Sequence, residues 1–104
     1  METKTLIRVA TKLDLPESGK VKEVFANEKF LCMANIDGEI YVMDNVCPHW
    51  GGPLGRGRVE HGKIVCPWHG WTFDPKTGET PRKANTRVAT YRVIIEGEDV
   101  FVEF

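Results

Sequence analysis

The sequence has few cysteines and no long apolar run. Its 104 residues include only three cysteines, which argues against the disulfide framework of a small secreted domain. No stretch approaches the roughly 18 apolar residues of a membrane-spanning helix, and the N-terminus lacks the apolar core of a secretory signal. We therefore expect no membrane association and a cytoplasmic location, where thiols stay reduced.

Charge and length narrow the functional classes further. Fourteen basic residues oppose fifteen acidic ones, giving a formal net charge of -1, so no excess of positive charge predicts nucleic-acid binding. A chain of this length has room for one domain, which we expect to span residues 1–104. No nucleophile with a neighbouring base and no mononuclear iron motif is evident, so we expect no catalytic site.

Short alternating and β-branched runs separated by Gly, Pro, Asn and Asp predict an all-β chain of antiparallel strands without a helix. The Asp37-Gly38 pair predicts a two-residue hairpin turn that needs positive φ at Gly38. His61-Gly62 and Gly97-Glu98 are expected to close two more hairpins. The expected strands are Leu6 to Ala10, Val21 to Phe25, Phe30 to Ile36, Glu39 to Met43, Arg58 to Glu60, Lys63 to Val65, Trp71 to Phe73, Val88 to Glu96 and Val100 to Phe104.

Two short motifs carry most of the chemistry. Cys47-Pro48-His49 is followed, after sixteen intervening residues, by Cys66-Pro67-Trp68-His69. These motifs use two of the three cysteines and two of the three histidines, a concentration that scatter would rarely produce. Thiolate and imidazole are strong ligands for transition metals, so the pattern predicts a metal site in two loops that follow strands.

The two loops resemble those of the Rieske [2Fe-2S] proteins. The first continues as Trp50-Gly51-Gly52-Pro53-Leu54 and the second as Gly70-Trp71-Thr72-Phe73-Asp74. The resemblance implies one [2Fe-2S] cluster per chain, with Cys47 and Cys66 on one iron and His49 and His69 on the other. It also implies the Rieske fold of small antiparallel sheets, with a cluster-binding subdomain over residues 44–74 approximately.

Residues 91–102 further resemble the Rieske-type ferredoxins of bacterial multicomponent oxygenases. This implies a one-electron carrier between an NAD(P)H-dependent flavoprotein reductase and a terminal oxygenase. High-potential Rieske proteins carry a serine and a tyrosine two and four residues after the second histidine, where this chain has Trp71 and Phe73. Without these hydroxyl donors the reduced cluster is less stabilised, so we expect a low potential.

Alternatives remain open at this point. A zinc site would use the same residue types, and the small subunit of an NAD(P)H-dependent nitrite reductase has a similar size. A redox-sensing regulator would need an appended effector segment, and an oxygenase Rieske domain would be followed by a catalytic domain.

The other notable side chains have simpler interpretations. We expect Cys32 to fill space in the core and His61 to lie in an exposed turn. Trp71 is expected to pack against other side chains, whereas Trp50 and Trp68 are expected to be partly exposed. The glycines beside the ligands, Gly51, Gly52 and Gly70, are candidates for backbone N–H donors to sulfur.

Overall fold

The computed structural model describes residues 5–104, and within them the all-β prediction is confirmed. All nine expected strands are present with bounds that differ by at most two residues. Two short 3₁₀ helices correct the expectation of no helix, and neither is long or apolar enough to cross a membrane. The elements are β1 (Leu6–Thr11), η1 (Lys12–Asp14), β2 (Lys20–Ala26), β3 (Lys29–Ile36), β4 (Glu39–Asp44), η2 (Leu54–Arg56), β5 (Arg58–Glu60), β6 (Lys63–Val65), β7 (Thr72–Phe73), β8 (Thr90–Glu96) and β9 (Asp99–Glu103).

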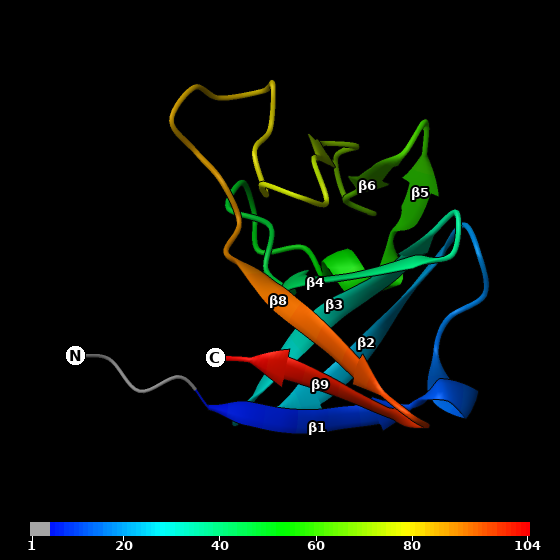
Figure 1. Cartoon of the computed structure of the whole chain (residues 1–104). Helices are drawn as coiled ribbons and strands as arrows, with labels where there is room; N and C mark the ends of the chain where they lie inside the picture. The colour runs from blue at the N-terminus through cyan, green and yellow to red at the C-terminus, as the bar shows by residue number, and fades with distance from the viewer. Residues whose placement is uncertain (1–4) are drawn as a thin grey trace.

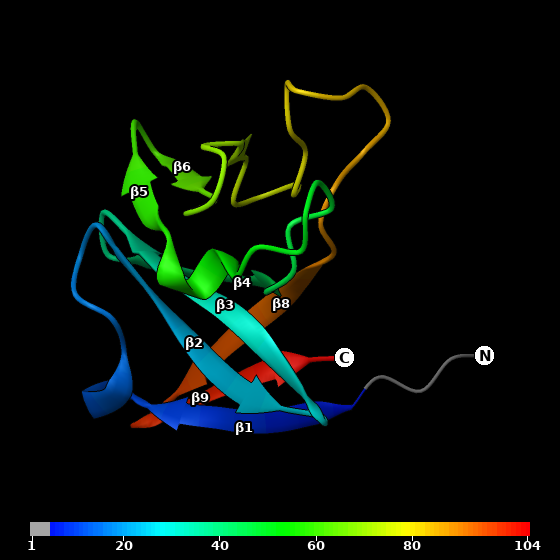
Figure 2. The same ribbon diagram turned by 180° about the vertical axis from the view of Figure 1, so that it is seen from behind.

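The strands form two antiparallel sheets of unequal size. The large sheet has the order β1-β9-β8-β4-β3-β2, and the small sheet has the order β5-β6-β7. Figure 1 and the reverse view in Figure 2 show the small sheet above one end of the large one, with the chain passing into it after β4 and out of it before β8. The large sheet curls, so that β1 at one edge comes close to β2 at the other.

β3 lies between two hydrophobic cores, which explains why its sequence is apolar without alternation. Leu31 and Met33 point into a core enclosed by the large sheet, together with Val42, Val100 and Val102. Cys32 and Ala34 point the opposite way, into a second core shared with the small sheet. This second core is the one that contains Cys47 and Cys66.

The predicted hairpin turns have the expected backbone conformations. Asp37 and Gly38 have φ values of 54° and 89°, and His61 and Gly62 have φ values of 51° and 75°. Left-handed conformations at both central residues are typical of the two-residue turns that match strand twist. A further turn of this kind, at Asn27 and Glu28 with φ values of 53° and 64°, was not predicted because Glu is an unusual residue there.

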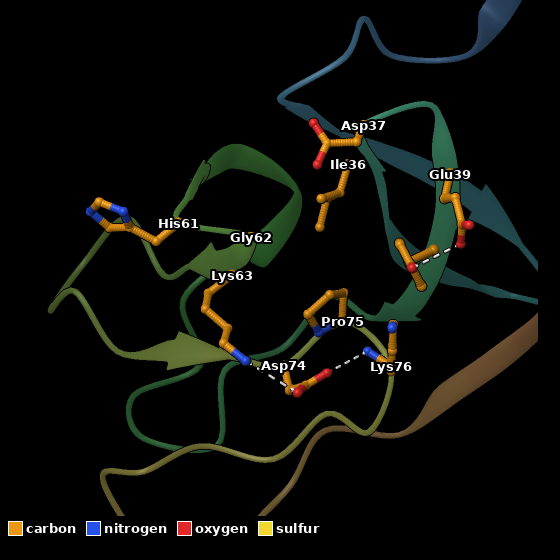
Figure 3. Close-up of a pocket in the computed structure, with 10 residues that line it drawn as sticks. Ile36, Asp37, Glu39, His61, Gly62, Lys63, Asp74, Pro75 and Lys76 are labelled. Atoms are coloured by element: carbon orange, nitrogen blue, oxygen red, sulfur yellow. Dashed lines mark hydrogen bonds and ion pairs between the residues drawn. The ribbon is translucent and has the colours of Figure 1, made fainter.

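A polar cleft of about 410 Å³ separates the β3–β4 turn from the small sheet (Figure 3). Asp74 anchors one side of it, because its carboxylate accepts a hydrogen bond from the Lys76 backbone N–H at 2.8 Å and pairs with the Lys63 ammonium at 3.1 Å. The Lys76 hydrogen bond, followed by the Lys63 contact, lowers the pKa of the Asp74 carboxyl. His61 lies at the rim of the cleft, exposed as predicted.

Candidate metal centre

The two loops that carry the predicted ligands share one backbone hydrogen-bond pattern. The Cys47 N–H donates to the Gly52 carbonyl at 2.9 Å, and the Cys66 N–H donates to the Trp71 carbonyl at 2.8 Å. Within each loop the glycine four residues after the cysteine donates back to the cysteine carbonyl, Gly51 at 2.8 Å and Gly70 at 3.2 Å. Each loop is therefore a closed turn that begins at its cysteine.

This pattern shows one role of Gly51 and Gly70. Their N–H groups donate to the carbonyl oxygens of Cys47 and Cys66. Their φ values of 79° and 72° show that glycine permits the left-handed conformation that closes each turn. The Cys47 sulfur accepts hydrogen bonds from the backbone N–H groups of His49 and Trp50.

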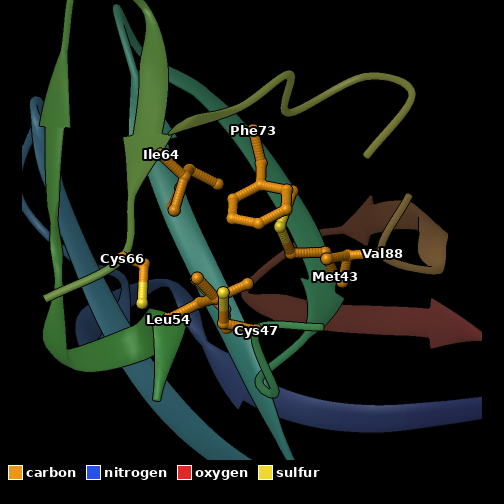
Figure 4. Packing of buried hydrophobic residues seen from close by; sticks show 9 residues of the cluster. Met43, Cys47, Leu54, Ile64, Cys66, Phe73 and Val88 are labelled. Carbon is orange, nitrogen blue, oxygen red and sulfur yellow. The ribbon is translucent and has the colours of Figure 1, made fainter. Parts of the chain in front are cut away.

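The two cysteine side chains meet in the second core. Cys47 is 1% exposed and Cys66 is 2% exposed. Figure 4 shows both side chains pointing into the same space beside Leu54, which is fully buried. Burial raises the pKa of the Cys47 thiol, the hydrogen bond from His49 opposes that effect, and the neighbouring Cys66 raises the pKa further. Bound iron would lower the pKa of this thiol, since a thiol that coordinates a metal is deprotonated.

The two histidine side chains meet on the exposed side of the same loops. The ring centroids of His49 and His69 are 5.0 Å apart with an interplanar angle of 73°. The His49 ring stacks on Trp71 at 4.3 Å and 7°, so the position of this imidazole is fixed by packing. Trp71 is half-buried against the second core, as expected.

The other two tryptophans lie at the surface around the histidines. Trp50 is 66% exposed and Trp68 is 57% exposed, which confirms the prediction for both. The Trp50 ring lies 5.6 Å from the His49 ring and 5.8 Å from the His69 ring. The exposed end of the site is therefore an aromatic surface with two imidazoles at its centre.

These donors fit a [2Fe-2S] cluster held by two thiolates and two imidazoles. The thiols are paired on the buried side and the imidazoles are paired on the exposed side, so each pair can serve one iron. Gly52 supplies a further test of fit, because a Cβ there would lie 2.7 Å from the Cys66 sulfur and 3.2 Å from the Trp68 ring. Only a residue without a side chain leaves the space between the loops open.

The first loop is held to the large sheet by a residue that the sequence did not indicate. Asn45 is 6% exposed, and its side chain donates to the Glu23 carboxylate at 2.6 Å and accepts from the Gly55 N–H at 2.6 Å. Arg56 pairs with the same Glu23 at 2.7 Å, and this contact, followed by that of Asn45, lowers the pKa of the carboxyl. β2, η2 and the first loop are thereby joined.

Comparison with protein-family models identifies residues 5–92 as a Rieske [2Fe-2S] domain. The chain belongs to the Rieske family. This assignment decides between the cluster and the zinc site, and it establishes the [2Fe-2S] cluster as the cofactor of the domain. The predicted assignment of individual ligands remains an inference from the residues and their geometry.

Several relatives of this Rieske chain are known. It is 34% identical over 102 residues to the ferredoxin component of the naphthalene 1,2-dioxygenase system of Pseudomonas aeruginosa, with 97% of each chain covered. It is 32% identical over 87 residues to apoptosis-inducing factor 3 of Homo sapiens, covering 83% of this chain but only 14% of that protein. The chain thus matches small ferredoxins over their full length and larger proteins over a small part.

Solved structures give the same fold. A ferredoxin of Sphingomonas yanoikuyae B1 superimposes with a TM-score of 0.82 at 31% identity, covering 96% of this chain and 99% of that one. A putative NADH-dependent nitrite reductase small subunit from Mycobacterium tuberculosis superimposes with a TM-score of 0.85 at 16% identity, covering 99% and 97%. The second likeness shows the fold alone, and the Rieske fold predicted from the two loops is confirmed.

Proposed function

We propose that this chain is the ferredoxin component of a multicomponent oxygenase system, carrying single electrons from an NAD(P)H-dependent flavoprotein reductase to a terminal oxygenase. The observation that supports this most is the full-length similarity to the naphthalene 1,2-dioxygenase ferredoxin. A bound [2Fe-2S] cluster supplies a site that gains and loses one electron. The proposal also places the protein in the cytoplasm, with no catalytic site of its own.

The arrangement of ligands supports electron transfer at the histidine end. In this proposal Cys47 and Cys66 hold one iron in the core, and His49 and His69 hold the other at the surface. The exposed imidazoles then form the shortest route between the site and a docked partner. Trp71 keeps the His49 ring in one orientation, and the buried Leu54 excludes water from the thiolate side.

We also propose a low reduction potential, near the lower end of about -150 mV for Rieske centres. Trp71 stacks on His49 and Phe73 is fully buried in the second core, so neither of these two positions offers a hydroxyl to a cluster sulfur. Such donors stabilise the added negative charge of the reduced state. Protein-film voltammetry at neutral pH measures this directly, and a clearly positive potential would overturn the proposal.

The small subunit of an NAD(P)H-dependent nitrite reductase is the alternative. The structural likeness to such a protein is at 16% identity, whereas two oxygenase ferredoxin components are 34% and 35% identical over 97% of this chain. Copurification with a large sirohaem subunit would favour the alternative.

The test is reconstitution of the electron-transfer chain. Purified holoprotein is mixed with NADH and the flavoprotein reductase of a naphthalene 1,2-dioxygenase system, and reduction is followed by the loss of visible absorption. The oxygenase component and naphthalene are then added, and the oxidised product is quantified. We expect product only when all components are present. A holoprotein that is reduced by dithionite but passes no electrons to any oxygenase would refute the proposed function.

A further inference from the structure

The segment between the small sheet and β8 is rich in unpaired positive charge. Residues 80–87, here called the basic loop, contain Arg82, Lys83 and Arg87, and no acidic residue occurs from residue 80 to residue 95. In Figure 1 this loop, coloured yellow to orange, projects from the molecule at the end where the small sheet lies. Its cations make no ion pair with any of the described residues 5–104, while those of the small-sheet region, Arg56, Arg58 and Lys63, are each paired with a carboxylate.

The basic loop adjoins the first ligand loop, because Arg87 lines the same groove as Val46 and Pro48, the residues on either side of the proposed ligand Cys47. The unpaired cations of the basic loop therefore act on a charged group that approaches this end of the molecule. An acidic surface is attracted there and a basic one is repelled.

An apolar groove adjoins the same loop. Its volume is about 380 Å³, and it is lined by Lys29, Phe30, Asp44, Asn45, Val46, Pro48, Arg87, Val88 and Ala89. Val46 is 63% exposed and Phe30 is 55% exposed, and exposed apolar side chains that lie together are typical of interaction surfaces. Val46 and Pro48 flank the ligand Cys47, and Arg87 belongs to the basic loop, so the groove joins the cluster-binding loop to the cations.

We propose that the basic loop and this groove form one docking face for a redox partner protein whose surface is acidic and carries an apolar side chain that enters the groove. The inference rests on the proposed function and adds the chemistry of the partner. A protein surface fits better than nucleic acid or a lipid headgroup, because the net charge of the chain is -1 and the groove is apolar. Charge then accelerates the encounter, and groove contacts lengthen the life of the complex.

The role of the positive charge of the basic loop is tested by two double variants, each of which replaces two cations with glutamate. Holoprotein with Arg82→Glu and Lys83→Glu is compared with a control carrying Lys12→Glu and Lys20→Glu, two exposed cations without ion pairs in the region that the structure describes. Both variants change the net charge by the same amount. We expect electron transfer to the naphthalene oxygenase to slow roughly tenfold or more at low salt in the first variant only. Rising salt should reduce this difference.

The groove is tested by a matched pair of phenylalanines. Phe25 and Phe30 face each other across β2 and β3 with ring centroids 5.1 Å apart, but only Phe30 lines the groove. Phe30→Ala and Phe25→Ala both remove this ring contact. We expect Phe30→Ala to weaken the complex with the oxygenase about fivefold without changing its salt dependence, while Phe25→Ala leaves the affinity unchanged.

A small anionic oxidant separates failure of this inference from failure of the proposed function. Ferricyanide accepts one electron from the reduced holoprotein without a protein partner, and the Arg82/Lys83 variant should react more slowly than the Lys12/Lys20 control. Equal rates for the two variants, with ferricyanide or with the oxygenase, would overturn the docking face. A wild type that reacts with ferricyanide as expected but reduces no oxygenase would instead count against the proposed function.

Discussion

Gly52, in the first loop, lies against Cys66 and Trp68 of the second loop. A Cβ at this position would approach the Cys66 sulfur to 2.7 Å, closer than such atoms come without one of them moving. Gly51, its neighbour, has nothing within 4 Å of an added Cβ but has a φ of 79°. The two adjacent glycines are therefore required for different reasons, one for space and the other for backbone conformation.

We expect Gly52→Ala to reduce the iron content of the purified protein, because the Cys66 sulfur or the Trp68 ring must shift away from the site. Gly51→Ala should retain iron and show only a loss of stability of about 1 kcal/mol from left-handed strain. Iron analysis and the visible spectrum measure the first effect, and thermal unfolding measures the second. Full iron occupancy in Gly52→Ala would contradict this account of the contact.

Cys32 has no exposed surface, and burial, with a smaller contribution from the Glu23 carboxylate, raises the pKa of its thiol to about 12. In the unfolded chain the thiol pKa is about 8.5. The thiol therefore contributes stability below about pH 8.5 that is lost as the pH rises towards 12. Cys32→Ala should be less stable than wild type at pH 8, and the difference in thermal midpoint should narrow at pH 10 and above. A constant difference across this range would show that the thiol does not titrate as described.

The sequence made some single residues predictable and others not. Cys32 within Phe30 to Ala34 and His61 beside Gly62 were placed correctly, because burial and turn geometry follow from local pattern. The contact of Gly52 with Cys66 could not be predicted, since it joins two loops that are fourteen positions apart in the chain. The role of Asn45 depends on Glu23 and was missed for the same reason.

Asn45 connects three elements that are separate in sequence, and Asn35 provides a comparison. Each side chain makes two hydrogen bonds, those of Asn35 being to the Pro16 carbonyl and the Gly38 N–H, both at 2.9 Å. Only Asn45 reaches the first cluster-binding loop and η2. The same kind of amide thus fixes a hairpin at one position and the cluster site at the other.

We expect Asn45→Ala and Asn35→Ala to lower the free energy of unfolding by comparable amounts, about 1–3 kcal/mol, because each leaves a backbone N–H without its side-chain partner. Only Asn45→Ala should accelerate the loss of iron to a chelator, since it releases the Gly55 N–H beside Leu54. Thermal unfolding and the rate of bleaching by the chelator are the two measurements. Equal bleaching rates in the two variants would rule out a specific role for Asn45 at the site.

At the level of elements, strand positions were easier to predict than strand partners. The run Lys63 to Val65 lies between two turn-forming pairs, His61-Gly62 and Cys66-Pro67, which mark where the strand begins and ends. These bounds are confirmed. The order β1-β9-β8-β4-β3-β2 places the first strand beside the last, and such long-range pairing leaves no local signal. The apolar run of β3 indicated a buried strand. It did not show that alternate side chains of this strand point into two different hydrophobic cores.

The whole molecule has two hydrophobic cores, and only one of them contains proposed metal ligands. The first core lies within the large sheet and has no ligand. The second includes Cys47 and Cys66, and its small sheet has strands of only three, three and two residues. Such short strands contribute little cooperative stability of their own.

We therefore expect the metal-free protein to keep the large sheet and lose the small one. In a Cys47→Ser, Cys66→Ser variant, amide hydrogen exchange should remain slow in β2, β3 and β9 and become fast in β5, β6 and β7. The iron-loaded wild type should protect both sheets, because ligation stabilises the folded loops. Uniform protection in the variant, or uniform loss of it, would show that the two parts fold as one unit.

β1 and β9 pair along one edge of the molecule, and the pairing continues to the last residue, where Thr5 and Phe104 exchange two backbone hydrogen bonds of 3.2 and 2.9 Å. In both views this edge lies away from the small sheet. A linker attached at residue 104 would thus extend an edge that contains none of the four proposed ligands. Immobilised in this way on an electrode, the molecule would keep all four ligand positions free of the attachment.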